Sequence, residues 1–166
     1  AKLGAVLPSV LYDQKQGARL ATEHLIKLGH RQIAEISGPL QNHDGLDRHE
    51  AWKDTMQEYD LPAHMTIEGD FSIESGYHSM KMLLDSSEEF SAVFIGNDSM
   101  AIGAHTALRE QGLRVPEDIS IVSFDDIPEA AHFVPGLTTV RQDFQLLGRL
   151  AVEYVLSMIE NPDTPI

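Results

Sequence analysis

The 166-residue sequence predicts an α/β fold with a parallel sheet, because segments patterned as strands alternate with segments patterned as helices. The strand-like runs are short and apolar, as strands buried on both faces are. The helix-like segments, each of roughly a dozen residues, match the crossovers that join parallel strands. Together these observations indicate repeated βαβ units.

Five helices are expected from apolar positions that recur at helical spacing. Gly29 and Gly112 are suited to the position just after a helix, and they end the first and the fourth. Trp52 and Met56 lie four residues apart and share one face of the second helix. Ser72 gives the third helix a partial capping signal, and an Asn-Pro pair ends the fifth helix. In chain order, the helices are expected at 16–28, 47–59, 72–84, 99–111 and 144–159.

Six strands are expected around these helices, and the most apolar of them is the fifth. In chain order, they are expected at 9–12, 32–36, 65–68, 92–95, 119–124 and 138–140. A further strand would continue the pattern after the last helix, and the chain begins at Ala1 rather than Met. We therefore expect segments beyond both ends of the given sequence.

The composition limits the classes of partner that this chain could bind. A net charge of −14 opposes contact with DNA phosphates, which normally requires a basic patch. The alternative is that the negative charge only keeps the protein soluble. The absence of cysteine excludes disulfides and thiol catalysis. The longest apolar runs are only about as long as a strand, so we expect no membrane contact, and we expect no signal peptide.

Polar side chains follow two of the expected strands. Asn97 and Asp98 come after the strand at 92–95, and Asp125 and Asp126 come after the strand at 119–124. Ligands of open α/β sheets bind outside the carboxyl ends of the strands, and amide and carboxylate groups suit the hydroxyls of a sugar. The alternative is that these residues cap the helix or turn that follows each strand.

Two further residues are candidates for ligand contact. Arg19 is expected in the first turn of a helix, where the helix dipole disfavours a cation, so its presence suggests a ligand or a carboxylate partner. Trp52, the only tryptophan, could stack on a sugar face. The alternatives are a solvated surface arginine and a tryptophan packed in the core.

Neither a metal nor an enzyme pattern is evident. The eight histidines lack a paired ligand spacing such as His-x-x-x-His, and no glycine-rich phosphate loop is present. Catalysis by Asp125 or Asp126 would need a proton-transfer partner that nothing in the sequence supplies. We therefore expect no catalytic residue, no metal site and no cofactor.

Several ordered stretches resemble the effector-binding domain of the LacI/GalR family of bacterial transcriptional regulators. Pro39, Arg48 and Trp52 also match that pattern. The stretches are GARLATEHLIKLGHRQIA at 17–34, NDSMAIGA at 97–104, GLRVPEDIS at 112–120, FDD at 124–126 and LTTVRQDF at 137–144.

The resemblance implies a periplasmic binding protein type I fold, with two flavodoxin-like lobes joined by three crossovers and the ligand in the cleft between them. Residues 1–141 would be the C-terminal lobe, a flavodoxin-like parallel sheet with helices on both faces. Residues 142–166 would form a crossover and a helix that belongs with the N-terminal lobe. The effector contacts that the resemblance implies are Arg19, Arg48, Trp52, Asn97, Asp125 and Gln142.

The implied function is that of the sugar-binding and dimerisation part of a cytoplasmic repressor, with 99–111 and 127–136 as interface candidates. A small-molecule effector would shift the balance between lobe arrangements and so control operator binding, which would use an absent N-terminal helix-turn-helix domain rather than this segment. The alternative is a periplasmic sugar-binding protein that serves a transporter. The sequence encoded upstream of Ala1 distinguishes the two.

Overall fold

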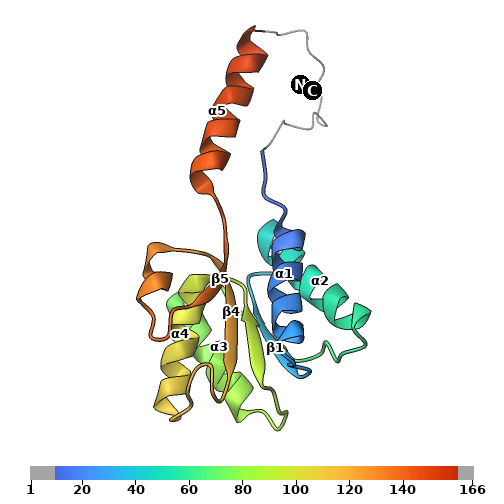
Figure 1. Cartoon of the computed structure of the whole chain (residues 1–166), viewed down its shortest axis with the longest axis vertical. Helices are drawn as coiled ribbons and strands as arrows, with labels where there is room; N and C mark the ends of the chain where they lie inside the picture. The colour runs from blue at the N-terminus through green and yellow to red at the C-terminus, as the bar shows by residue number, and fades with distance from the viewer. Residues whose placement is uncertain (1–9, 161–166) are drawn as a thin grey trace. The chain divides into compact units, whose positions relative to one another are not determined.

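A computed structural model describes residues 10–160, which divide into two compact units (Figure 1). The larger unit is Gln14–Arg141. The smaller unit contains the described residues 10–13 and 142–160. The assignment of 142–166 to the N-terminal lobe of a two-lobed domain stays a prediction.

The larger unit contains a five-stranded, wholly parallel sheet of order β2-β1-β3-β4-β5, which confirms the predicted fold class. The chain first adds β2 on one side of β1 and then returns to add β3 on the other. Such a reversal leaves a crevice outside the carboxyl ends of the two strands, here β1 and β3. The strands are β1 (Ile33–Ser37), β2 (Thr66–Glu68), β3 (Ala92–Ile95), β4 (Ser120–Asp125) and β5 (Thr138–Arg141).

Helices cover both faces of this sheet (Figure 1). Side chains alternate along β3, so that Phe94 packs with α1 and α2, whereas Val93 and Ile95 pack with α3 and α4. A 3-10 helix, η1 (Pro128–His132), lies between β4 and β5. The helices of this unit are α1 (Gln14–Lys27), α2 (His43–Glu58), α3 (Ile73–Asp85) and α4 (Asp98–Glu110).

Helices α3 and α4 approach each other backbone to backbone. A Cβ atom placed on Gly103 would lie 1.9 Å from the carbonyl oxygen of Ile73, and one placed on Gly76 would lie 2.1 Å from that of Met100. Any side chain at either position would push the helices apart. Two glycines thus set the spacing of this layer.

Helices α1 and α2 begin two and four residues earlier than the sequence predicts. α2 begins at His43 rather than at residue 47, because the side chain of Asn42 accepts a hydrogen bond from the Asp44 amide and caps it. α1 begins at Gln14 rather than at residue 16. Arg19 is therefore the sixth residue of α1 and lies in its second turn, not in the first turn as expected.

The smaller unit contains α5 (Phe144–Glu160), whose first turn is capped by the Asp143 carboxylate at 2.9 Å from the Leu146 amide. The strand expected at 9–12 does not form over residues 10–12, and Ser9 lies outside the described residues. A four-residue apolar run cannot be told from an extended link by periodicity alone. Across residues 10–160, no helix has the length and apolar character to cross a bilayer.

Candidate ligand-binding site

Helix α2 carries Arg48 to the carboxyl edge of the sheet, where the strand order reverses. Its side chain is buried, with only 4% of the residue exposed. Nη1 donates a hydrogen bond to the carbonyl oxygen of Gly96, the residue after β3, at 2.5 Å. The Gly96 amide in turn donates to the carbonyl of Ile36 in β1 at 2.8 Å. Arg48 thus lies over the junction of the two strands that flank the crevice.

Two other elements, α1 and β4, hold the same guanidinium. Nε donates to the side-chain oxygen of Gln14, at the start of α1, at 2.9 Å. Nη2 lies 3.5 Å from Oδ1 of Asp125, at the end of β4. The group also lies 3.8 Å from the centre of the Phe124 ring, in cation–π geometry. The site is therefore assembled from α1, α2, β3 and β4 around one cation.

Burial lowers the pKa of Arg48 below its ordinary value, and the carboxylates of Asp125, Asp44 and Asp98 oppose this shift. An arginine side chain remains charged in proteins nevertheless. The result is a fixed array of N–H donors beside the Asp125 carboxylate, whose side chain is 20% exposed. Donors and acceptors that lie side by side suit a ligand with adjacent hydroxyl groups.

The backbone that presents Asp125 is held in an unusual conformation. Asp125 has a φ of +114° and Asp126 a φ of +57°, both in a region that non-glycine residues seldom adopt. The buried carboxylate of Asp98 holds this turn: Oδ2 accepts from the Ile127 amide at 2.9 Å, and Oδ1 accepts from the Thr139 hydroxyl at 2.7 Å. Asp98 therefore ties the loop after β4 to β5 and to the start of α4.

Asn97 caps α4. Its side-chain oxygen accepts from the Met100 amide at 2.9 Å, and its nitrogen donates to the Phe71 carbonyl at 3.2 Å. Only 9% of the residue is exposed. The capping alternative is thus what the structure shows, and a ligand contact by Asn97 stays a prediction.

Arg19 lies apart from the Arg48 group. Its Nε donates to Glu23 at 2.9 Å, and its two Nη atoms donate to the Glu58 carboxylate at 3.0 and 2.6 Å. Glu58 is ten residues beyond Arg48 on α2, a separation of about 15 Å along a helix. Hydrogen bonds from Glu58 and Glu23 raise the pKa of Arg19. Of the two roles suggested for Arg19, a ligand contact or a carboxylate partner, the structure shows the carboxylate partner.

Trp52 and Gln142 are placed differently from the other candidates. The Trp52 ring is wholly buried in the hydrophobic cluster under α1 and α2. It is therefore a core residue, which was the alternative to sugar stacking. Gln142 belongs to the smaller unit, between β5 and α5. Stacking of a sugar on Trp52 and contact of the ligand with Gln142 stay predictions.

Helix α1 reaches the site because Gly17 has no side chain. A Cβ atom at Gly17 would lie 2.6 Å from two atoms of the Phe124 ring, the ring that supports Arg48. In the sequence, Gly17 and Phe124 stand out only as parts of motifs, and Gln14 does not stand out at all. A glutamine at the start of a helix carries no local signal, since its role depends on an arginine 34 residues later in the sequence.

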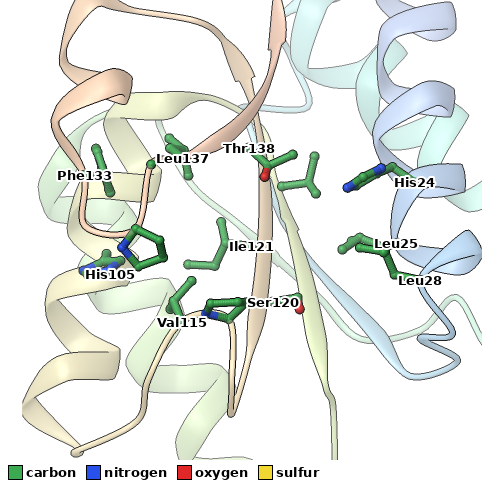
Figure 2. A pocket seen from close by; sticks show the side chains of 14 residues that line it. His24, Leu25, Leu28, His105, Val115, Ser120, Ile121, Phe133, Leu137 and Thr138 are labelled. Atoms are coloured by element: carbon green, nitrogen blue, oxygen red, sulfur yellow. The ribbon is translucent and has the colours of Figure 1, made fainter.

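A hollow of about 310 Å³ lies elsewhere in the larger unit. It borders Ser120 and Ile121 at the amino end of β4, opposite to Asp125, and Figure 2 shows His24 of α1 and His105 of α4 at its sides. Its lining is mainly apolar and shares no residue with the Arg48 group. Among the described residues, no group of three or more histidine or acidic side chains is arranged to hold a metal.

The sequence matches the model of the periplasmic binding protein-like domain over residues 22–166. Among curated proteins, it is 40% identical over 155 residues to the HTH-type transcriptional repressor PurR of Salmonella paratyphi B. That match covers 92% of this chain and 46% of the relative. The chain therefore spans about half the length of the curated relatives that it matches.

Solved structures of the same kind superpose closely. A complex of the transcriptional regulator CelR with cellobiose has a TM-score of 0.88 and 35% identity, over 98% of this chain and 51% of that one. The Lac repressor dimer bound to operator and the anti-inducer ONPF has a TM-score of 0.87 and 36% identity, over 92% and 54%. The Escherichia coli transcriptional repressor ascG has a TM-score of 0.86 and 32% identity, over 92% and 56%.

Proposed function

The chain belongs to the periplasmic binding protein-like domain family, in its branch of LacI-type transcriptional regulators, and we propose that it forms the effector-binding C-terminal lobe of a repressor. The observation that carries the proposal is the Arg48 group at the junction of β1 and β3. It gathers a buried cation, a carboxylate and an aromatic ring at the edge of the sheet where ligands of this fold class bind.

A neutral sugar or sugar-like molecule is the ligand class that this group suits best. Arg48 is already matched by Asp125, so the ligand need not bring a charge of its own. Arginine N–H groups donate and a carboxylate accepts, and a pair of hydroxyls satisfies both. The CelR complex with cellobiose supports this choice. We propose Arg48 and Asp125 as the principal contacts, with Asn97 beside them.

Ligand control of DNA binding would act through the balance between two lobe arrangements. A ligand shifts such a balance only if it binds one arrangement more tightly than the other. Contacts from a second lobe would supply that difference, so we expect this chain alone to bind sugar weakly. The operator would be bound by a separate domain, since a net charge of −14 opposes contact between this segment and DNA.

We also propose that the protein acts in the cytoplasm, as a homodimer and without catalysis. The Lac repressor structures that this chain matches include dimers. The candidate surfaces are α4 and the segment 127–136, which contains Val134, exposed over 89% of its area. The curated relatives that are 40% identical to this chain are transcriptional repressors. This favours a regulator over a transport receptor or an enzyme.

Two experiments test this proposal. The first is sequencing upstream of the codon for Ala1: a helix-turn-helix supports a regulator, whereas a signal peptide supports a transport receptor and overturns the proposal. The second is calorimetric titration of the longest product of the gene with cellobiose and a panel of monosaccharides.

The matched variants for the titration are Asp125→Asn and Asp126→Asn. Both remove one carboxylate from the same turn, but Asp126 lies 3.8 Å from Arg141 rather than beside Arg48. We expect only the first change to weaken binding by tenfold or more, the order of about 1.4 kcal/mol. If the two changes weaken binding equally, Asp125 is not a ligand contact.

A further inference from the structure

Another buried ionisable group lies between β1 and α2. Glu35, in the middle of β1, has no exposed surface. Its Oε2 atom accepts a hydrogen bond from Nδ1 of His49 at 2.6 Å and another from the hydroxyl of Thr66 in β2 at 2.8 Å. Its Oε1 atom is buried and has no hydrogen-bond partner among the described residues. A carboxylate thus lies in the core with half of its acceptor capacity unused.

His49 is the residue after Arg48 on α2. The two side chains leave the helix on different faces: His49 reaches β1, whereas Arg48 reaches the residues after β3 and β4. The His49 ring also lies 6.0 Å from the ring of Trp52. The pair therefore ties α2 to the sheet one residue away from the main ligand contact.

Several charged groups surround His49. Glu35 faces it from β1, and Glu50 and Lys53 flank it on α2 itself. Lys15 of α1 binds Glu50 at 2.6 Å, and β2 contributes the uncharged Thr66 hydroxyl. The hydrogen bond to Glu35 raises the pKa of His49 and outweighs the burial that lowers it.

A buried ion pair is a weak source of stability, since apolar residues of similar size often serve as well or better. Its strength depends on both partners, because a buried carboxylate without a cation beside it is unfavourable. Protonated His49 supplies that cation, and neutral His49 does not. The tie between α2 and β1 is therefore sensitive to the protonation of one imidazole.

We propose that the Glu35–His49 pair positions α2, and with it Arg48, so that protonation of His49 strengthens ligand binding at the Arg48 site. This inference rests on the proposed function for the ligand itself. Ligand affinity falls as the pH rises through the pKa of His49. A coupling of ordinary size between two sites changes affinity by roughly fivefold or more.

The positioning can be measured without any ligand. In NMR spectra recorded from pH 5 to 9, the imidazole signals of His49 report its protonation, and the Nε–H signal of Arg48 reports the hydrogen bond to Gln14. We expect both to move with one midpoint. Trp52 gives a second reporter, because it is the only tryptophan and a protonated imidazole beside an indole quenches its fluorescence.

Two variants complete the test. His49→Gln removes the titrating group, and His43→Gln is the matched control, an exposed histidine on the same helix that binds Asp47 at 3.2 Å. The Arg48 and Trp52 transitions should disappear in the first variant and remain in the second. An Arg48 signal that stays constant while His49 titrates overturns the inference.

Cellobiose is the probe for affinity, titrated at pH 6 and pH 8.5. An affinity that falls in the wild type but stays flat in His49→Gln supports the inference, and an equal pH dependence in both proteins overturns it. Coupled NMR transitions without any binding of cellobiose or of a monosaccharide panel would support the positioning role and count against the proposed ligand class. The two failures are therefore distinguishable.

Discussion

The guanidinium of Arg48 lies 3.8 Å from the centre of the Phe124 ring, and both groups are almost wholly buried. This contact joins α2 to the end of β4. It also fixes the plane in which the arginine presents its N–H groups beside Asp125.

Replacing Phe124 should therefore affect binding as well as stability. We expect Phe124→Leu and Phe94→Leu to cost about 1–2 kcal/mol of unfolding free energy each, because both rings are fully buried in the same cluster. Only the first should also weaken sugar binding, by about fivefold or more, since a cation–π contact contributes roughly 1 kcal/mol, and more when it is desolvated. Urea unfolding and calorimetry check the two parts. Equal affinities of the two variants would show that the ring does not orient Arg48.

The two arginines offered by the sequence can be compared directly. Arg48→Lys removes the planar fork that holds Gly96, Gln14 and Asp125 together, whereas Arg19→Lys alters a partly exposed pair with Glu58. We expect the Arg48 change to weaken binding at least tenfold more than the Arg19 change. A larger effect at Arg19 would make Arg19, and not Arg48, the main effector contact.

Asn97 should act chiefly as a helix cap. We expect Asn97→Ala to cost about 1 kcal/mol, the usual loss for a capping side chain. Asn97→Asp keeps the acceptor for the Met100 amide and loses only the donor to the Phe71 carbonyl, so it should retain most of the stability. Urea unfolding of both variants, with Asn42→Ala at the cap of α2 as the control, decides the matter. Similar losses for Ala and Asp would show that the Phe71 contact dominates.

Asp98 and Thr139 should be energetically coupled. The Thr139 hydroxyl donates to the buried Asp98 carboxylate, and hydrogen bonds to charged groups contribute about 1.5–3 kcal/mol. We expect non-additivity in a double-mutant cycle with Asp98→Asn and Thr139→Val. The sum of the unfolding free energies lost in the two single variants should exceed the loss in the double variant by at least about 1 kcal/mol. Strict additivity would mean that the Asp98 bond to the Ile127 amide holds the turn alone.

Two histidines should give opposite pH dependences of stability. The pKa of His49 is raised, first by its hydrogen bond to Glu35, so its contribution is full below about pH 6.5 and is lost as the pH rises through the folded-state value. Burial lowers the pKa of His30, which binds the hydroxyls of Ser91 and Ser120. Its contribution is present above about pH 6.5 and is lost as the pH falls.

The measurement is urea unfolding at a series of pH values. The difference between the wild type and His49→Gln should shrink from pH 6 to 9, and that between the wild type and His30→Asn should shrink from pH 7 to 5. Parallel curves for the wild type and either variant would refute the corresponding assignment.

The sequence was a good guide to the sheet, because short apolar runs between helical patterns admit few other arrangements. It placed β3 at 92–95, the bounds that the structure has. It was a poorer guide to helix starts, since Asn42 and its neighbours carry no apolar periodicity and act through a capping bond. The late start predicted for α1 in turn led to a misplaced Arg19.

For the site, the motifs pointed to the carboxyl edge of the sheet, where the Arg48 group lies, but not to the contacts of individual side chains. The amide of Asn97 suits both a helix cap and a ligand contact, so the sequence leaves the two open. The Glu35–His49 pair was missed altogether. A glutamate inside an apolar strand and a histidine 14 residues later give no sign of contact until β1 and α2 are packed together.

The glycines of α3 and α4 give the two layers of helices unequal freedom. On that side of the sheet, backbone lies against backbone at Gly76 and Gly103, so no side chain separates α3 from α4 at these two positions. On the other side, α2 is held in part by Arg48 and His49, through interactions that a proton or a bound molecule can strengthen or weaken. The spacing of α3 and α4 is thus set at two points by shape, whereas the hold on α2 depends partly on charge, the kind of contact that a change in pH alters.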